Sequence, residues 1–321
     1  MVRRRASFAA MLGRRRFDGA PRLALAPTDV RPWLADAVVA GGGEIVALAD
    51  AEALVWSEPG RSDALSDALA SAPGIHWVQL PWAGIEPLVG VLDEEHLWTC
   101  GKGVYAEEVA EHALAMALAG LRSLVSYARR STWSGPEGRN LLGARVTVLG
   151  GGGICESLVR MLGPFGARIT VLRRTIAPMP GVDHVGTLDE LDEVLGRTDV
   201  LVLALALTPA TTGLIGAAQL ARLPPHAWIV NVARGAHIVT DALVDALRRG
   251  SIAGAALDVF ETEPLPDGHP LWSLPNCLVT PHVGNTPDMA LPALSRRVTD
   301  NVGRFARGEP LIGVVDVRLG Y

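Results

Sequence analysis

Short apolar runs and longer amphipathic runs alternate along the chain from Leu23 onward. The short runs have the length and composition of buried strands, and in chain order they are "LALAP", "EIVAL", "ALVWSE", "IHWVQL" and "LWTCG". The segment "RSDALSDALASA", between the third and fourth runs, places apolar residues on one helical face. Strand and helix patterns that alternate in this way predict a parallel sheet covered by helices.

A long helix and a second alternating series follow. An amphipathic pattern without proline predicts a helix from about Ala106 to Arg129. Strands are expected after it near residues 146–149, 169–172, 200–204, 228–232, 255–259 and 277–280. Helices are expected between them near residues 154–164, 188–195, 216–222 and 240–248, and a final amphipathic stretch covers Met289 to Ala306.

These patterns predict an α/β protein with two doubly wound parallel sheets, which also suits the length of 321 residues. We expect one domain over residues 22–104 and 287–321, with a second domain over residues 105–286 inserted into it. A cleft between such domains is the usual place for a ligand.

Composition narrows the classes of protein. The hydrophobic fraction of 49% and the charged fraction of 20% are typical of a globular chain, and a net charge of -5 provides no basic field for nucleic acid. No apolar run approaches the roughly 18 residues of a membrane span. Cys100, Cys155 and Cys277 are far apart, which argues against a zinc site or disulfide framework and favours the cytoplasm. Residues 1–21 are expected to be a flexible basic tail, or the product of a translation start placed too far upstream.

The stretch "VTVLGGGGICESL", residues 146–158, joins a strand to a helix through four glycines. Gly150 and Gly152 allow a sharp turn and a close approach of backbone N–H groups to a pyrophosphate at the positive end of the next helix, which is expected to begin at Ile154. The third glycine of a G-x-G-x-x-G loop is replaced by Cys155, which is small enough if the helix moves outward slightly. By itself the loop is also compatible with a merely structural turn.

Arg173 and Arg174 stand where an NAD-binding fold would place a carboxylate for the ribose 2′-hydroxyl. Guanidinium groups suit a 2′-phosphate instead, so the sequence favours NADP(H) over NAD(H). The alternative is that these arginines only cover the sheet edge in solvent.

Three stretches at predicted strand ends supply reactive side chains: "NVARG", "ALDVFETEPLPDGHPLW" and "TPHVGNT". Reduction of a 2-keto acid needs a cation for the carboxylate, an acid for the developing alkoxide, and a carboxylate to orient that acid. Arg234, His282 and Glu263 match these needs. Glu261 competes with Glu263, and Arg234 as a surface ion pair or His282 as an ordinary loop histidine are the alternatives.

In the order and the residues of these motifs, the chain from about Leu23 onward resembles the D-isomer-specific 2-hydroxyacid dehydrogenase family. The resemblance implies Rossmann-like domains, hydride transfer from a nicotinamide, no metal, and a homodimer. It implies that Arg234 binds substrate, that Glu263 pairs with His282, and that His282 is the general acid and base. The cofactor-binding residues expected from the loop and the resemblance together are Gly150, Gly152, Gly153, Ile154, Arg173, Arg174, Thr208, Thr211, Val232, Ala233 and Asp258. Asp258 matches the family aspartate that contacts the nicotinamide amide, and Ala206 replaces a proline common in the threonine loop.

The segment "QLPWAGIEPLV" is similar to the family's substrate loop, which points to the backbone N–H groups of Ala83 and Gly84 as ligands of the substrate carboxylate, with Trp82 lining the pocket. Its residues look closer to those of glyoxylate/hydroxypyruvate reductase-like members than to those of phosphoglycerate dehydrogenases, which implies a small 2-keto acid reduced to a D-2-hydroxy acid. Lys102 and Tyr105 are interpreted as cleft-facing or structural.

A nicotinamide-sensing binding protein of the corepressor type, which shares this fold, is the alternative function. A formate dehydrogenase would need further polar residues that the sequence does not show. His112, in the long helix, and His269, in a turn, are interpreted as structural.

Overall fold

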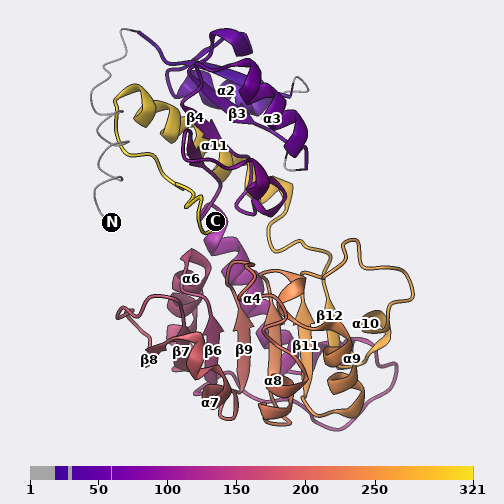
Figure 1. Cartoon of the computed structure of the whole chain (residues 1–321). Helices are drawn as coiled ribbons and strands as arrows, with labels where there is room; N and C mark the ends of the chain where they lie inside the picture. Colours follow the sequence, from indigo (N-terminus) through magenta and orange to yellow (C-terminus); the bar gives the residue numbers. More distant parts are fainter. Residues whose placement is uncertain (1–18, 28–30, 59, 321) are drawn as a thin grey trace. The chain divides into compact units, whose positions relative to one another are not determined.

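The computed structural model describes residues 19–27, 31–58 and 60–320 (Figure 1). The chain forms two compact units, one from Met1–Tyr105 and Pro287–Tyr321 and the other from Ala106–Thr286. We call the first the flanking unit and the second the inserted unit. The expected basic tail lies almost wholly outside the described residues. Within the described part of the chain, no helix is both long and apolar enough to cross a membrane.

The flanking unit is a five-stranded parallel sheet in the order β2-β1-β3-β4-β5. Its strands are β1 (Arg22–Ala26), β2 (Glu44–Ile45), β3 (Ala53–Trp56), β4 (Trp77–Gln79) and β5 (Leu97–Thr99). Its helices are α2 (Pro32–Ala40), α3 (Ser62–Ser71) and α11 (Pro287–Ala306), with 3-10 turns at Leu48–Asp50 and Glu86–Val91. The run "EIVAL" forms only the two-residue edge strand β2, because the chain then turns into the first 3-10 turn.

Successive residues of β3 point to opposite faces of this sheet. Ala53 and Val55 pack in the cluster formed with α2 and α11, whereas Leu54 and Trp56 pack in the cluster formed with α3. Both faces of the strand are therefore buried, which explains why its sequence is a continuous apolar run rather than an alternating one.

The inserted unit is a seven-stranded parallel sheet in the order β12-β11-β10-β9-β6-β7-β8. Its strands are β6 (Arg145–Leu149), β7 (Arg168–Leu172), β8 (His184–Gly186), β9 (Val200–Leu203), β10 (Trp228–Asn231), β11 (Gly254–Leu257) and β12 (Cys277–Val279). The strand order reverses between β6 and β9, and a doubly wound sheet binds its ligand at the carboxyl ends of the strands at such a reversal. Strand β8 was not expected from the sequence, because its three residues are too few to form a recognisable apolar run.

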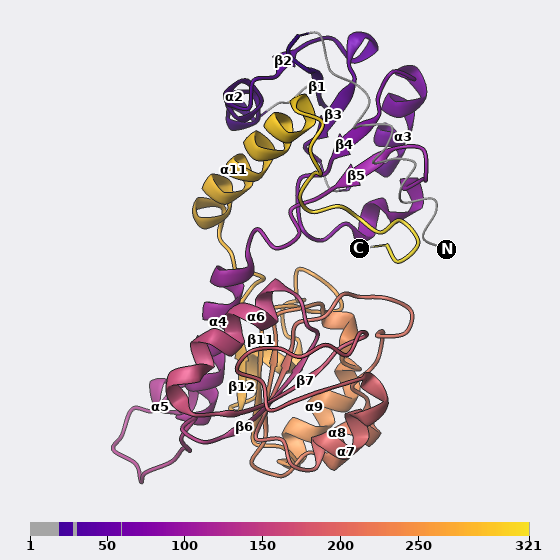
Figure 2. The ribbon, with the colours of Figure 1, turned by 90° about the vertical axis from the view of Figure 1, so that its left-hand side faces the viewer.

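Helices cover both faces of this sheet (Figure 2). They are α4 (Ala106–Leu121), α5 (Leu124–Ala128), α6 (Gly153–Leu162), α7 (Leu191–Leu195), α8 (Ala217–Arg222), α9 (Thr240–Arg249) and α10 (Pro270–Ser273), with 3-10 turns at Gly163–Phe165, Leu188–Glu190 and Gly235–His237. Helices α4 and α6 pack on one face, and α7, α8 and α9 pack on the other. Together with the flanking unit, this arrangement is the expected pair of parallel-sheet α/β domains.

The expected single helix from Ala106 to Arg129 is wrong, because it divides into α4 and α5. Ser123 lies between them in a left-handed conformation with a φ of 53°. The carbonyl of Leu121 accepts a hydrogen bond from the backbone N–H of Arg139 at 2.6 Å. The loop that contains Arg139 therefore occupies the Leu121 carbonyl, which a continuing helix would use as an acceptor. The apolar periodicity of residues 106–129 does not reveal this contact, because Arg139 lies outside that range.

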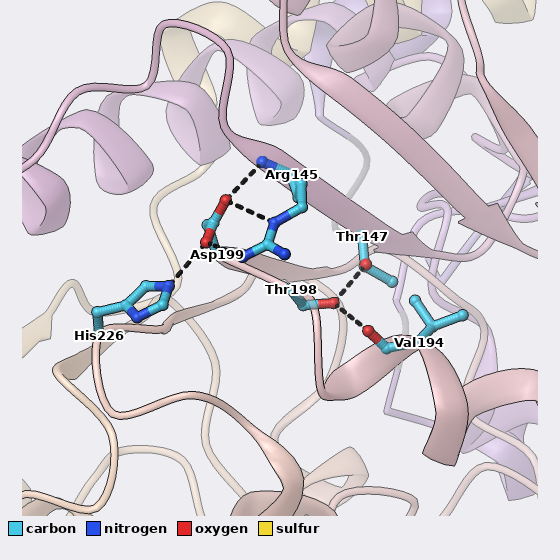
Figure 3. Close-up of polar contacts among 6 residues, drawn as sticks. All are labelled: Arg145, Thr147, Val194, Thr198, Asp199 and His226. Carbon is cyan, nitrogen blue, oxygen red and sulfur yellow. Dashed lines mark hydrogen bonds and ion pairs between the residues drawn. The ribbon is translucent and has the colours of Figure 1, made fainter.

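A polar cluster lies at the amino ends of the strands of the inserted sheet, which we call its amino edge (Figure 3). Asp199, just before β9, accepts hydrogen bonds from Arg145 N at 2.8 Å, Arg145 Nη2 at 2.9 Å and His226 Nε2 at 2.7 Å. Burial raises the pKa of Asp199, but the hydrogen bonds from Arg145 and His226 outweigh it and hold that pKa well below its ordinary value. We call Arg145, Asp199 and His226 the amino-edge cluster.

Candidate active site

The glycine loop lies at the point where the strand order of the inserted sheet reverses. Gly150 has a φ of 105°, and a Cβ at this residue would come within 2.3 Å of the Ala204 carbonyl oxygen. Both the conformation and the close approach exclude a side chain. Gly150 N also donates to the Leu172 carbonyl at 2.8 Å, so the turn is fixed to two neighbouring strand ends. The requirement for glycine at this position is therefore steric.

The loop leads directly into α6, which begins at Gly153 with Gly152 as its N-cap. Gly152 has no side chain to satisfy the N–H groups of the first helical turn, so these remain suited to an anion. The Arg173 side chain lies against the same loop, since a Cβ on Gly151 would meet Arg173 Nε at 2.7 Å. Arg173 is half-buried there, whereas Arg174 is exposed. A helix N-terminus with a guanidinium beside it fits the phosphates of a dinucleotide.

Cys155 is fully buried and packs in the hydrophobic cluster formed by α4, α6 and one face of the sheet. The α4 residues in that cluster include Ala110, Ala113 and Ala117. Burial raises the pKa of the Cys155 thiol to about 12, so it stays neutral at physiological pH. Cys155 is therefore a core residue of the helix. The expected outward shift of α6 stays a prediction.

The two threonines expected near the cofactor brace their own loop. Thr211 Oγ1 accepts from Thr208 N at 2.8 Å and lies 2.9 Å from the Ala206 carbonyl. The sequence analysis missed His237, which is fully buried, with Nδ1 2.9 Å from the Thr211 carbonyl and Nε2 3.2 Å from the Leu205 carbonyl. His237 thus ties this loop to the turn that follows β10.

Arg234 lies in a tight turn after β10, and the last residue of that strand holds the turn. Asn231 accepts from Ala233 N at 3.0 Å through Oδ1 and donates to the Arg234 carbonyl at 2.9 Å through Nδ2. Val232 and Ala233 are buried, and the half-buried Arg234 donates from Nη1 to the Ala233 carbonyl at 2.7 Å. The buried amide of Asn231, which the sequence analysis also missed, therefore shapes the segment that presents the guanidinium.

The Arg234 turn lies in direct backbone contact with the segment that carries both candidate glutamates. A Cβ on Gly235 would come within 1.8 Å of the Phe260 carbonyl carbon, so only glycine permits this approach. Glu261 turns toward Thr240, whose hydroxyl lies 3.2 Å from Glu261 Oε2. Glu263 Oε2 lies 2.7 Å from His282 Nδ1, and Glu263 Oε1 accepts from Phe260 N at 2.9 Å. The geometry therefore pairs Glu263, not Glu261, with His282.

His282 is one of two described non-glycine residues with positive φ, at 53°. Its backbone N–H donates to the Asp258 carbonyl at 2.8 Å, and its side chain is 52% exposed. Because Nδ1 faces Glu263, Nε2 is the ring atom left to face a substrate. A half-exposed imidazole oriented by a carboxylate is the usual arrangement of a general acid and base.

Asp258 stands after β11 and is almost fully buried. Its Oδ1 accepts from Thr280 Oγ1 at 2.5 Å and Val283 N at 2.9 Å, and its Oδ2 accepts from Gly284 N at 2.8 Å. His112 Nε2 lies 3.4 Å from the same Oδ1. Burial raises the pKa of Asp258, but the hydrogen bonds from His112, Thr280 and the two backbone amides lower it overall. The expected contact of Asp258 with a nicotinamide amide stays a prediction.

The expected substrate loop belongs to the flanking unit. Trp82 is half-buried, and the Arg31 guanidinium lies 5.6 Å from its ring centroid. The Trp82 carbonyl accepts from Gly101 N at 2.9 Å, which fixes the loop against the strand β5 end. Ala83 is exposed and Gly84 is half-buried. This loop therefore presents backbone groups and one indole.

Other residues singled out in the sequence have local contacts. The Lys102 carbonyl accepts from Arg297 Nη1 at 3.0 Å, and His269 caps α10 by accepting from Leu271 N at 3.3 Å. Among the residues that the structure describes, no group of three or more His, Cys, Asp or Glu side chains could hold a metal ion.

Comparison with known proteins gives consistent matches. A model of the D-isomer specific 2-hydroxyacid dehydrogenase NAD-binding domain matches residues 112–284. Glyoxylate/hydroxypyruvate reductase A of Photorhabdus laumondii is 32% identical over 285 residues, which cover 84% of this chain and 87% of that protein.

Two solved structures match nearly the whole chain. The D-isomer specific 2-hydroxyacid dehydrogenase of Xanthobacter autotrophicus Py2, in complex with NADPH and MES, has a TM-score of 0.82 at 29% identity and covers 94% of this chain and 100% of its own. The NADPH-dependent glyoxylate/hydroxypyruvate reductase of Sinorhizobium meliloti, in complex with NADP and sulfate, has a TM-score of 0.78 at 28% identity with coverage of 94% and 100%. With the geometry above, these matches show that the chain belongs to the D-isomer specific 2-hydroxyacid dehydrogenase family.

Proposed function

We propose that this protein reduces a small 2-keto acid to the D-2-hydroxy acid with NADPH. The observation that carries the proposal is the His282–Glu263 pair, 2.7 Å apart, in a segment whose backbone touches the Arg234 turn. These side chains follow three strands of one sheet, so its carboxyl edge gathers an acid, its orienting carboxylate and a cation. Relatives named as glyoxylate/hydroxypyruvate reductases support the same reaction.

Each of the three side chains has a distinct task in this reaction. Arg234 engages the substrate carboxylate with paired N–H donors and so orients the ketone. A reduced nicotinamide held at the glycine loop would supply the hydride for the carbonyl carbon. The π electron pair of the carbonyl moves onto its oxygen, which takes the proton from His282 Nε2. Glu263 accepts from His282 Nδ1–H and thereby holds the ring so that Nε2 is left for the substrate.

The residues around the glycine loop support NADPH as the reductant. The loop and the open first turn of α6 suit the pyrophosphate, and Arg173 beside Gly151 suits the 2′-phosphate. Arg174 is the weaker candidate because it is exposed. The expected Gly150, Gly152, Gly153 and Ile154 lie in that loop. Two of the similar structures are complexes with NADPH or NADP, which supports the preference.

We propose that the loop Trp82–Gly84 of the flanking unit binds the substrate carboxylate through its backbone N–H groups. A bulky indole beside such a carboxylate site favours substrates with a small third substituent. Glyoxylate and hydroxypyruvate are the leading candidates, as in the names of the relatives.

The test is a panel of glyoxylate, hydroxypyruvate, pyruvate and a bulkier branched 2-keto acid, each with NADPH and with NADH. We expect kcat/KM to be highest for the first two substrates and at least about tenfold higher with NADPH, as one lost charged contact predicts. Chiral chromatography should show the D product. If the absorbance of the reduced nicotinamide did not fall with any substrate, the proposed reductase activity would be contradicted and a nicotinamide-sensing role would be favoured.

Arg173→Ala and Arg174→Ala form a matched pair for the cofactor proposal. Arg173→Ala should raise KM for NADPH by about 10-fold or more and leave KM for NADH nearly unchanged, because NADH has no phosphate to lose. Arg174→Ala should have the smaller effect. Equal losses for both cofactors would contradict the assignment of Arg173 to the 2′-phosphate.

We also propose a homodimer. In the stretch after α4, Trp133 is fully exposed at 102%, with Leu124 and Leu142 at 53% and 65%. Large apolar side chains exposed to solvent favour burial against a second copy. Sedimentation velocity should show a dimer that Trp133→Ser weakens; a wild-type monomer at micromolar concentration would contradict the proposal.

A cytoplasmic location is proposed from the cysteines. All three are free and buried, as expected for a protein that matures in a reducing compartment. Fractionation of the native host should place the protein with cytoplasmic enzymes.

A further inference from the structure

His112 takes part in a hydrogen-bond chain to which the proposed reaction assigns no task. Its Nε2 lies 3.1 Å from Thr280 Oγ1, and Thr280 Oγ1 lies 2.5 Å from Asp258 Oδ1. A carboxylate can only accept, so the Thr280 hydroxyl must donate to Asp258. The hydroxyl then accepts from the imidazole, which makes His112 Nε2 a donor. The direction of the chain is therefore fixed from His112 through Thr280 to Asp258.

The chain ends on the carboxylate that fixes the backbone around His282. Asp258 accepts from the amides of Val283 and Gly284, and its own carbonyl accepts from His282 N. These bonds surround a histidine held at a φ of 53°, a conformation that non-glycine residues adopt only when neighbouring contacts require it. The side chain of Asp258 thus acts as a clamp on the loop that presents the proposed acid.

His112 also packs against that loop directly. A Cβ on Gly284 would come within 3.0 Å of Asp258 Oδ2 and 3.6 Å of His112 Cδ2. His112 lies on α4 shortly after the chain enters the inserted unit at Ala106, and Gly284 lies two residues before the unit ends at Thr286. The hydrogen-bond chain therefore joins the first helix of this unit to its last segment.

We infer that His112 is a positioning residue for His282, acting through Thr280 and Asp258. This inference rests on the proposed reductase function. When the imidazole donor is removed, Thr280 and Asp258 each lose a partner, and the loop can relax from the conformation that aims His282 at the substrate. The loss should appear in kcat rather than in cofactor binding, because a misplacement of about 1 Å costs up to about 100-fold in rate.

The test compares four variants with the wild-type protein. His112→Leu keeps much of the bulk and removes the donor, His112→Gln keeps an N–H near the position of Nε2, and Thr280→Val breaks the middle of the chain. His226→Leu is the matched control, since His226 also pairs with an aspartate but at the amino edge of the sheet. The readouts are kcat and KM for glyoxylate and NADPH, and amide hydrogen exchange of the peptide that covers residues 280–286.

We expect His112→Leu and Thr280→Val to lower kcat by about 10- to 100-fold, with KM for NADPH changed less than about twofold. Amide exchange at residues 280–286 should become faster in the same two variants. His112→Gln should recover most of the rate and protection, and His226→Leu should match wild type in both.

An unchanged kcat in His112→Leu, or equal losses in His112→Leu and His112→Gln, would overturn the inference, because the donor would then be irrelevant. If the wild-type protein reduces no 2-keto acid, the proposed function fails by itself. Loop exchange would still decide whether His112 fixes the His282 segment: wild-type protection in His112→Leu would overturn the inference in that case too.

Discussion

Two aspartates lie at opposite edges of the same seven-stranded sheet, and each has a histidine beside it. Asp199 precedes β9 at the amino edge and binds Arg145 and His226. Asp258 follows β11 at the carboxyl edge, beside His112. Its carboxylate accepts three hydrogen bonds from groups within residues 280–284. The first aspartate joins strand ends to one another, whereas the second shapes a loop that carries a reactive side chain.

The physical reason for this difference is the direction of the strands. In a parallel sheet all carboxyl ends meet at one edge, so the loops that leave them converge there. The amino edge receives the chain from the helices, and its polar groups have mainly to satisfy one another. We therefore expect changes at the carboxyl edge to alter turnover and changes at the amino edge to alter stability.

The largest expected effect is that of His282→Asn at the carboxyl edge. Asparagine tolerates the left-handed backbone but cannot deliver the proton, so kcat for glyoxylate should fall by about 10²- to 10⁴-fold. The dissociation constant of NADPH, measured by fluorescence titration, should change little. If His282→Asn kept the wild-type kcat, the assignment of His282 as the general acid would be wrong.

Asp199→Ala at the amino edge should leave kcat unchanged. It removes the acceptor for Arg145 and His226, so the free energy of unfolding should fall by about 1–3 kcal/mol. Urea titration followed by circular dichroism measures this loss. If kcat fell while the free energy of unfolding stayed unchanged, the proposal that the amino edge serves stability and the carboxyl edge serves turnover would be wrong.

The pH dependence of stability should show the same cluster. The pKa of folded Asp199 is held below its ordinary value of 3.8, so its contribution to stability is complete above that value. The contribution is lost as pH falls through the lower folded pKa. In urea titrations from pH 7 down to pH 3, the gap in midpoint between wild type and Asp199→Ala should therefore stay constant to about pH 4 and narrow progressively below it. A constant gap across that range would contradict this origin of the stability.

The smallest expected effect belongs to Cys155→Ala, in the core between the two edges. Alanine removes one buried sulfur and should cost about 1 kcal/mol of unfolding free energy, with unchanged affinity for NADPH. Because the thiol is buried and its pKa is raised to about 12, native wild-type protein should also resist alkylation there at pH 8. Rapid labelling of Cys155 would show that the helix opens at this point.

The sequence by itself determined the two-sheet architecture and the kind of chemistry. Continuous apolar runs between amphipathic segments identify buried parallel strands, as both faces of β3 illustrate. Gly150 was found because its conformation is a local property of the turn. Arg234, Glu263 and His282 were selected from the sequence because each follows a predicted strand, and resemblance to the family motif favoured Glu263 over Glu261.

Tertiary structure alone decided how distant groups meet. Only the fold shows that Glu261 turns to Thr240 while Glu263 reaches His282. Likewise, only the fold shows that the Arg139 N–H bonds to the Leu121 carbonyl at the end of α4. His112 looked like an ordinary helix residue because its partner Thr280 lies 168 positions away. Periodicity reports which face of an element is buried, but a hydrogen bond depends on where two elements come together, and that is set by the packing of the whole sheet.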